Sequence, residues 1–175
     1  MNDPWTDQPR LSGPHVTLRP MVRTDRDAIV AAASDGKLWE LFYTAVPSEV
    51  TIDAYLDTAE REAGYGRAMP FVVLDTAGKL VGCTRYMRMN KAARRLEIGT
   101  TFYAKSVQRS PVNSAAKLLL LTHAFDVMEA SCVQLRTDHF NQASQRAIER
   151  LGAKRDGVLR NHSIVDGRVR DTVCY

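Results

Sequence analysis

Polar side chains crowd the point where a long apolar helix is predicted to begin. Residues 106–125, SVQRSPVNSAAKLLLLTHAF, pass from a polar turn into a run of leucines. The Ser110-Pro111 pair is typical of a helix start, because the serine side chain caps a free amide and the missing N–H of proline costs nothing in the first turn. The following amides have no partner inside the helix, and together with the helix dipole they favour binding of an anion. We therefore predict an anion site formed by the amides of Val112, Asn113 and Ser114 and the side chains of Arg109, Ser110, Ser114 and Lys117. The alternative is an ordinary capped helix with solvated polar residues.

A carboxylate and a glycine share the strand predicted before this helix. In residues 94–104, RRLEIGTTFYA, Leu96 and Ile98 face one side, so that Glu97 faces the other. Gly99 interrupts the alternation, which indicates a bulge or a place where another group approaches the backbone closely. In structural terms alone, the carboxylate would pair with one of three nearby arginines, Arg85, Arg94 or Arg95.

A second polar helix start follows the strand predicted at residues 132–138. Asn141 is suited to cap the helix at residues 141–153, which Gly152 ends. The same turn carries Ser144. Two short polar side chains therefore lie beside the end of the strand, where they could also face a ligand.

The remaining segments complete an α/β pattern. We predict strands at 15–20, 71–75 and 80–89, helices at 25–34, 37–43 and 51–66, and a hairpin at 158–175 that turns on Asp166-Gly167. This order favours a mostly antiparallel sheet with one crossover through the long helix. In that helix we expect a buried stripe of Leu118, Leu121, Phe125 and Met128, with His123 outside it.

Length and composition fit one compact domain. The 175 residues are 45% hydrophobic and carry a formal charge of +4, without the basic stripe and stacking aromatics that nucleic-acid binding needs. Three widely spaced cysteines indicate neither a disulfide framework nor a metal site. No apolar run approaches the ~20 residues that span a membrane, and the first residues lack a signal-peptide pattern. A cytoplasmic protein is therefore expected.

The chain resembles the GNAT superfamily of acetyl-CoA-dependent N-acetyltransferases, and within it the RimJ/RimL-like branch of ribosomal-protein N-terminal acetyltransferases. The likeness begins near VTLRPM and rests on the order and spacing of LEIGTTFY, QRSPVNSAAKLLLLTHAF, LRTDHFNQASQRAIERLGAKRDGVLRNH and VDGRVRDTVCY. It implies a single-domain α/β fold of the GNAT type, a mixed, mostly antiparallel twisted sheet flanked by helices, with splayed central strands. The domain would span residues 14–175 after a flexible lead-in at 1–13. Its last strand shows no stop signal before Tyr175, so we expect truncation there.

The resemblance implies acetyl-CoA as the cofactor. The family binds the pyrophosphate with a Q/R-x-x-G-x-G/A loop, in which Gln108 matches the first position while Pro111 and Asn113 replace the glycines. The proline removes one amide donor and some room for close approach. Strand residues 101–103 match the segment that pairs with the pantetheine arm, and Asn141 matches an asparagine that contacts this arm. The expected cofactor contacts are Thr101, Phe102, Tyr103, Gln108, Arg109, Ser110, Val112, Asn113, Ser114 and Asn141.

Acetyl transfer to an amine needs a base, because a free α-amine has a pKa of about 8 and a lysine one of about 10.4. Glu97 matches the glutamate of the family's EIG strand and is the candidate. Many members use a tyrosine as the acid, but Ile148 occupies the matching position here. Ser144 matches a serine often found one turn earlier in the RimJ/RimL-like branch and is suited to donate a hydrogen bond to the sulfur. A strand amide near Thr101 would polarise the carbonyl.

The resemblance leaves the acceptor open between a protein or peptide N-terminus and a small-molecule amine. The first helices and the last hairpin form the acceptor pocket in this family, which implicates Trp39, Phe42, Tyr43 and Arg85. Aromatic residues at helical spacing are also typical of a core. A non-catalytic acyl-CoA sensor or interaction domain of the same fold is the alternative function. The sequence is compatible with a homodimer, and it indicates no nucleic-acid, membrane or metal partner.

Overall fold

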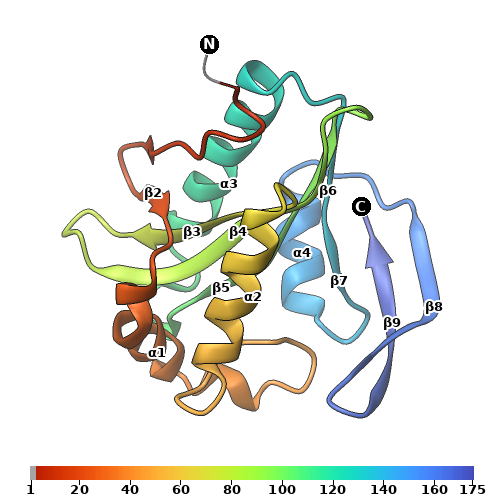
Figure 1. The fold of residues 1–175 in the computed structure, drawn as a ribbon. Coiled ribbons are helices and arrows are strands. Elements are labelled where there is room, and N and C mark those ends of the chain that lie inside the picture. Colours follow the sequence, from red (N-terminus) through yellow and green to blue (C-terminus); the bar gives the residue numbers. More distant parts are fainter. Residues whose placement is uncertain (1–2) are drawn as a thin grey trace.

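Residues 3–175 are described by a computed structural model, in which helices flank two sheets (Figure 1). The first sheet has six strands in the order β1-β2-β3-β4-β5-β6, and the second has three in the order β7-β9-β8. The strands are β1 Leu11–Ser12, β2 Thr17–Pro20, β3 Met69–Leu74, β4 Leu80–Asn90, β5 Arg95–Tyr103, β6 Cys132–Gln134, β7 Arg136–Asp138, β8 Gly157–Val165 and β9 Arg168–Cys174. The α-helices are α1 Arg26–Ser34, α2 Ile52–Gly64, α3 Val112–Thr122 and α4 Gln142–Arg150.

The central strands splay apart, as the resemblance implies. β5 and β6 form the one parallel pair of the described chain, over Arg95–Glu97 and Cys132–Gln134. After Leu135 the chain leaves this sheet, and β7 pairs with β9 instead. What we predicted as one strand is therefore two. Beyond Glu97, the edge of β5 that faces the splay has no strand partner within residues 3–175.

Two apolar clusters hold the sheet between its helices. On one face, Leu96 and Ile98 pack with Ala116 and Leu120 of α3. On the other face, Phe102 packs with α1 and α2. Within β5 the side-chain pattern changes face between these two sets. This change of face determines which side chains of β5 reach the candidate site.

Residues 3–13 are held against the domain, whereas we expected a flexible lead-in at 1–13, of which residues 1 and 2 lie outside the described part of the chain. β1 pairs with β2, and the Trp5 side chain is buried in the same cluster as α3. Its indole Nε1 donates a hydrogen bond to the Met128 carbonyl at 2.9 Å. A large buried aromatic residue explains why the segment is ordered.

The predicted helix at residues 37–43 is wrong. Only a 3-10 turn forms at Leu38–Glu40, because Lys37 adopts a left-handed φ of 48° and Leu41 is extended. The hairpin on Asp166-Gly167 is confirmed, and both of its turn residues have positive φ, as a type I′ turn requires.

The buried stripe predicted for the long helix is wrong in part, because Met128 is buried and Leu121 packs against the core, but the other two of its four residues are exposed. Leu118 and Phe125 are exposed, whereas His123 is buried and stacks on Tyr86, with ring centroids 6.0 Å apart. Burial lowers the pKa of His123. Ala116 of α3 and Ala124 of the π-helical turn His123–Val127 that continues it lie on the true buried face, where small residues let the helix approach the sheet closely. The run of four leucines concealed this phase, because every face of the helix looked apolar.

Candidate active site

The start of α3 presents two free amides. Ser110 Oγ accepts from the Val112 amide at 3.3 Å and donates to the Val107 carbonyl at 2.6 Å, so the serine binds the first helical amide although Pro111, not Ser110, occupies the N-cap position. Ala115 N bonds to the Pro111 carbonyl. The amides of Asn113 and Ser114 have no protein acceptor in the described chain. Two of the three amides predicted for the anion site are therefore available to a ligand.

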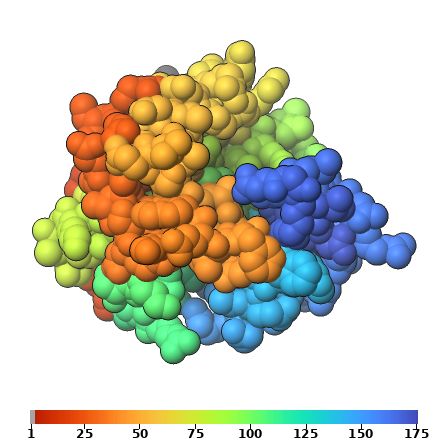
Figure 2. Space-filling view, turned by 90° about the horizontal axis from the view of Figure 1, so that it is seen from below, coloured from red at the N-terminus to blue at the C-terminus, as the bar shows by residue number. Residues whose placement is uncertain are grey.

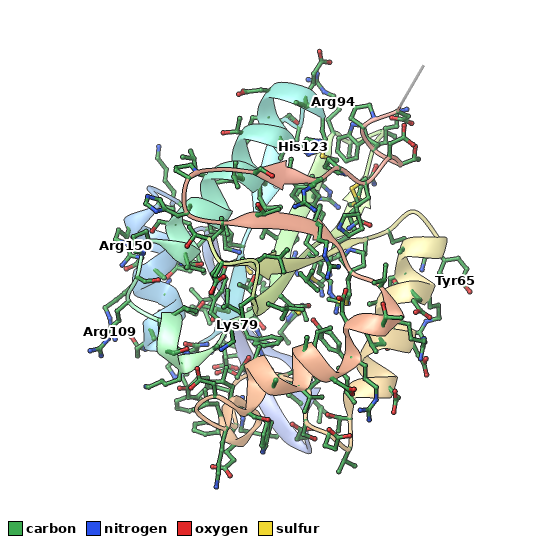
Figure 3. All side chains as sticks on the ribbon, turned by 90° about the vertical axis from the view of Figure 1, so that its left-hand side faces the viewer. Tyr65, Lys79, Arg94, Arg109, His123 and Arg150 are labelled. Carbon is green, nitrogen blue, oxygen red and sulfur yellow. The ribbon has the colours of Figure 1, made fainter. Side chains whose placement is uncertain are left out.

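Three side chains around this helix start differ in their exposure and in their contacts. Arg109 has a φ of 63° and projects from the outer edge of the molecule (Figure 3). Gln108 is exposed, and its Nε2 donates to the Tyr103 carbonyl at 3.0 Å. Lys117 is not part of the site surface, contrary to our expectation, because it is 5% exposed and its Nζ donates to Thr101 Oγ1 at 3.0 Å. Lysine reaches inward here because position 117 lies one turn after Asn113 on the sheet-facing side of α3.

A β-bulge in β5 changes the face to which its side chains point. Arg85 of β4 lies opposite Gly99 and Cys83 lies opposite Phe102, so that one residue of β4 faces two of β5. Thr100 has a φ of 48° at this point. The bulge turns Thr101 toward α3, where its hydroxyl also contacts Thr84 Oγ1 at 2.8 Å. The prediction of a bulge near Gly99 is confirmed.

Glu97 lies on the face of β5 opposite to α3, as its alternation predicts. The residue is 4% exposed, and its Oε2 is 2.6 Å from Arg88 Nη1 and 3.4 Å from Arg136 Nε. These partners differ from the three arginines that we considered. The carboxylate is thus held at the splay by one arginine from β4 and one from β7, which fixes its position between the two sheets.

The start of α4 has the predicted cap. Asn141 Oδ1 accepts from the Ser144 amide at 3.0 Å. The Ser144 hydroxyl has no partner within residues 3–175 and is half-buried, so it can donate to a ligand. Ile148 is 6% exposed and belongs to the core, where a tyrosine would be the usual acid of the resembled family.

The four residues expected at the acceptor pocket are not brought together. Trp39 packs against the core cluster of α1 and α2. Phe42 and Tyr43 meet at 5.1 Å between ring centroids on the surface, where the guanidinium of Arg168 from the last hairpin lies 5.3 Å from the Phe42 ring. Arg85 is buried elsewhere, under α2. The segment after α1 and the last hairpin therefore do meet, through the contact of Arg168 with Phe42 and not through the four residues that we predicted.

A pocket of about 530 Å³ lies between α2 and strands β4 and β5. It is the principal feature that the sequence did not reveal. Its lining consists of Ala45, Tyr55, Thr58, Glu62, Arg67, Ala68, Arg85, Met87, Arg88 and Thr100. In Figure 2 the green atoms of the central strands are visible in a hollow between the gold and orange segments and the blue hairpin. The spacing of Tyr55, Thr58 and Glu62 on one face of α2 was the signal that could have indicated it.

Two residues that line the pocket connect it to the candidate base Glu97. Arg88 lines the pocket and pairs with Glu97. Thr100, at the bulge of β5, lines it as well. A ligand in this pocket therefore lies beside the arginine that pairs with Glu97 and beside the irregular part of the strand.

Comparison with known proteins identifies the family. Residues 15–154 match the acetyltransferase (GNAT) domain family. The chain belongs to this family. Over 98 residues the GNAT chain is 30% identical to YdaF of Bacillus subtilis strain 168, provisionally named a ribosomal N-acetyltransferase, and this match covers 56% of the chain but only about half, 53%, of the relative.

Solved structures agree with the family. A GCN5-related N-acetyltransferase from Brucella melitensis is 28% identical, with a TM-score of 0.83 over 96% of this GNAT chain and 77% of that chain. RimJ of Mycobacterium smegmatis, solved with CoA-disulfide, is 23% identical, with a TM-score of 0.80 over 99% of this chain and 88% of that one. The second likeness concerns the fold alone. The predicted GNAT fold, with its splayed central strands, is therefore confirmed. No helix among residues 3–175 is long and apolar enough to cross a membrane.

Proposed function

We propose that this protein is a cytoplasmic N-acetyltransferase of the RimJ/RimL-like branch, which moves the acetyl group of acetyl-CoA to a primary amine by direct attack. The observation that carries the proposal is the pair of free amides at the start of α3, which open next to the splay in a chain of the GNAT family. Membership of the family supports the chemistry, and the similarity to N-acetyltransferases supports the amine as acceptor.

The chain's own groups fit a cofactor with a pyrophosphate and an extended amide arm. The amides of Asn113 and Ser114, with Arg109 beside them, would bind the pyrophosphate, since a helix start favours anions. The unpaired edge of β5, residues 101–103, would hold the arm by backbone hydrogen bonds. Acetyl-CoA supplies an activated thioester. The irregular backbone near Thr101 would direct an amide toward its carbonyl oxygen.

The acceptor amine reaches Glu97 from the pocket under α2. Glu97, directly or through a water molecule, removes the proton that the amine must lose. Arg88 and Arg136 hold the carboxylate in place. The arginines that line the pocket also disfavour a second positive charge, so they lower the pKa of a bound amine. The Ser144 hydroxyl would donate to the leaving sulfur, whose thiolate is a tolerable leaving group with a pKa near 8.5.

The replacement Glu97→Gln tests this assignment. Thiol release from acetyl-CoA in the presence of an amine should fall by about 10²- to 10⁴-fold, while acetyl-CoA affinity measured by calorimetry stays unchanged. Glu129→Gln, at an exposed position after α3, is the matched control. Equal turnover of the Glu97 variant and the parent would exclude Glu97 as the base. A parent protein that binds acetyl-CoA but acetylates no amine would instead be the non-catalytic sensor.

A further inference from the structure

Arg85 is a buried cation without a carboxylate partner in the described part of the chain. Its side chain lines the pocket under α2, and the residue is only 5% exposed. No ion pair to its guanidinium is present within residues 3–175, and its Nε is buried without an acceptor. Its one close neighbour of note is Tyr55, whose ring centroid lies 4.9 Å from the guanidinium carbon. Such a charge is costly to bury unless something neutralises it.

Of the other arginines at this place, Arg88 has a carboxylate partner and Arg67 is exposed to solvent. Arg88 pairs with Glu97, and Arg67 lies over the Tyr65 ring, with its guanidinium carbon 5.2 Å from the centroid. Glu62 is the one carboxylate of the lining, and it pairs with Arg61 at 3.7 Å. Residues 3–175 therefore supply no counter-ion for Arg85. The negative charge must come from outside the chain.

A second donor lies beside Arg85. The Tyr55 hydroxyl is buried and has no hydrogen-bond partner within the described residues. The guanidinium and the phenolic O–H offer several donors to a ligand in one pocket, and neither group carries a negative charge. The planar guanidinium matches a carboxylate, which it can bind through two parallel hydrogen bonds. Both observations point to the same class of ligand.

We propose that Arg85 and Tyr55 bind a carboxylate of the acceptor, so that the preferred substrate is an amine that carries a carboxylate a short distance from its nitrogen. This inference rests on the proposed transferase function. The pocket volume of about 530 Å³ lies within the range of small-ligand sites and accommodates an amino acid or the first residues of a peptide. A carboxylate on Arg85 also places the amine near Thr100 and Arg88, which line the same pocket, and Arg88 pairs with Glu97.

The same charges select against simple cationic amines. Arg67, Arg85 and Arg88 line the pocket with one glutamate, so a polyamine would add positive charge where three guanidinium groups already lie. A carboxylate-bearing amine compensates the charge and leaves its nitrogen in the neutral form that attacks. Arg85 thus acts on specificity rather than on the chemical step.

Two pairs of amines test the proposal in a thiol-release assay with acetyl-CoA. β-Alanine is compared with β-alaninamide, and an amidated Ala-Asp-Ala-Ala peptide is compared with amidated Ala-Asn-Ala-Ala. The parent protein should favour the carboxylate member of at least one pair by about 10- to 100-fold in kcat/KM, and Arg85→Gln should bring that ratio to about one. The pair that shows the preference identifies the source of the carboxylate, a small molecule or a peptide. Arg10→Gln, exposed and next to β1, is the control and should keep the preference.

A thermal-shift measurement with succinate at constant ionic strength gives a readout that does not depend on turnover. Succinate should raise the Tm of the parent and of Arg10→Gln but not of Arg85→Gln. Arg85→Met removes the buried charge and should have a higher Tm than the parent without responding to succinate, so the test survives if the glutamine variant folds poorly.

Three results would overturn the proposal. Equal turnover within both pairs would reject the carboxylate preference and leave the transferase function intact. A succinate response retained in both Arg85 variants would reject the role of Arg85. A folded protein that responds to succinate but acetylates none of the four amines would overturn both the acceptor role and the transferase function. The pocket would then bind anions without taking part in acetyl transfer.

Discussion

Replacing Lys117 by methionine should make the protein more stable at low pH and leave its stability nearly unchanged at high pH. Lys117 is 5% exposed and donates to Thr101 Oγ1 at 3.0 Å, and no carboxylate pairs with it within residues 3–175. Burial lowers its pKa from 10.5 to about 7. Methionine has a similar length and carries no charge, so it can fill the same space.

The sign follows from proton binding in the two states. Between pH 7 and 10.5 the unfolded chain holds a proton on Lys117 and the folded chain does not, so the free energy of unfolding rises with pH in this window. A pKa of 10.5 lowered to about 7 corresponds to about 5 kcal/mol in total. The penalty is fully present below pH 7, and about 4 kcal/mol of it is relieved by pH 10. Loss of the hydrogen bond to Thr101 subtracts about 1 kcal/mol from the gain.

Urea unfolding followed by circular dichroism at pH 6, 8 and 10 measures the effect. The difference in unfolding free energy between Lys117→Met and the parent should be about 3–4 kcal/mol at pH 6 and should shrink steadily toward pH 10. Titrating groups that both proteins share contribute equally to their unfolding free energies, so these contributions cancel in the difference. Lys79→Met is the control, because Lys79 is exposed in the turn between β3 and β4. Parallel pH profiles of parent and Lys117→Met, or a variant that is less stable at pH 6, would refute the argument.

Three further substitutions report on the fold, and urea unfolding measures each of them. Trp5→Ala should cost about 3–5 kcal/mol, because the indole is buried and bonds to Met128; a cost below about 1 kcal/mol would contradict the anchoring of the first residues. Asn141→Ala should cost about 1 kcal/mol through loss of the cap on the Ser144 amide, and an unchanged midpoint would exclude that cap. Gly82→Ala should cost at least about 2 kcal/mol, since the added methyl would lie 2.3 Å from a backbone carbonyl oxygen of β5, and a neutral result would mean that the strands can separate there.

Most strands and helix ends could be predicted from local sequence. Gly99 indicated the bulge, Asn141 the cap of α4, and Asp166-Gly167 the hairpin turn, because each of these features depends on the conformational preferences of a few adjacent residues. The face of α3 could not be read in the same way, since its four consecutive leucines fit every phase. The two polar residues that we placed outside, Lys117 and His123, are buried.

The site was harder to predict where it depends on distant segments. The split of one strand into β6 and β7 follows from pairing with β9, far along the chain, and no local signal marks Leu135. The pocket under α2 combines side chains from α2, β4 and β5, so the free charge of Arg85 emerges only when these elements pack. We predicted Arg85 at the acceptor but grouped it with aromatic residues that lie elsewhere.

The measurement that tests the central claim most directly follows both products of one incubation. Protein, acetyl-CoA and an equimolar mixture of the four amines are combined, free thiol is measured optically, and the amines are analysed by mass spectrometry. We predict one acetylated amine for each thiol released, with no release when either amine or protein is omitted. Thiol release without an acetylated amine, or no release from protein that binds acetyl-CoA, would contradict the proposed transferase function.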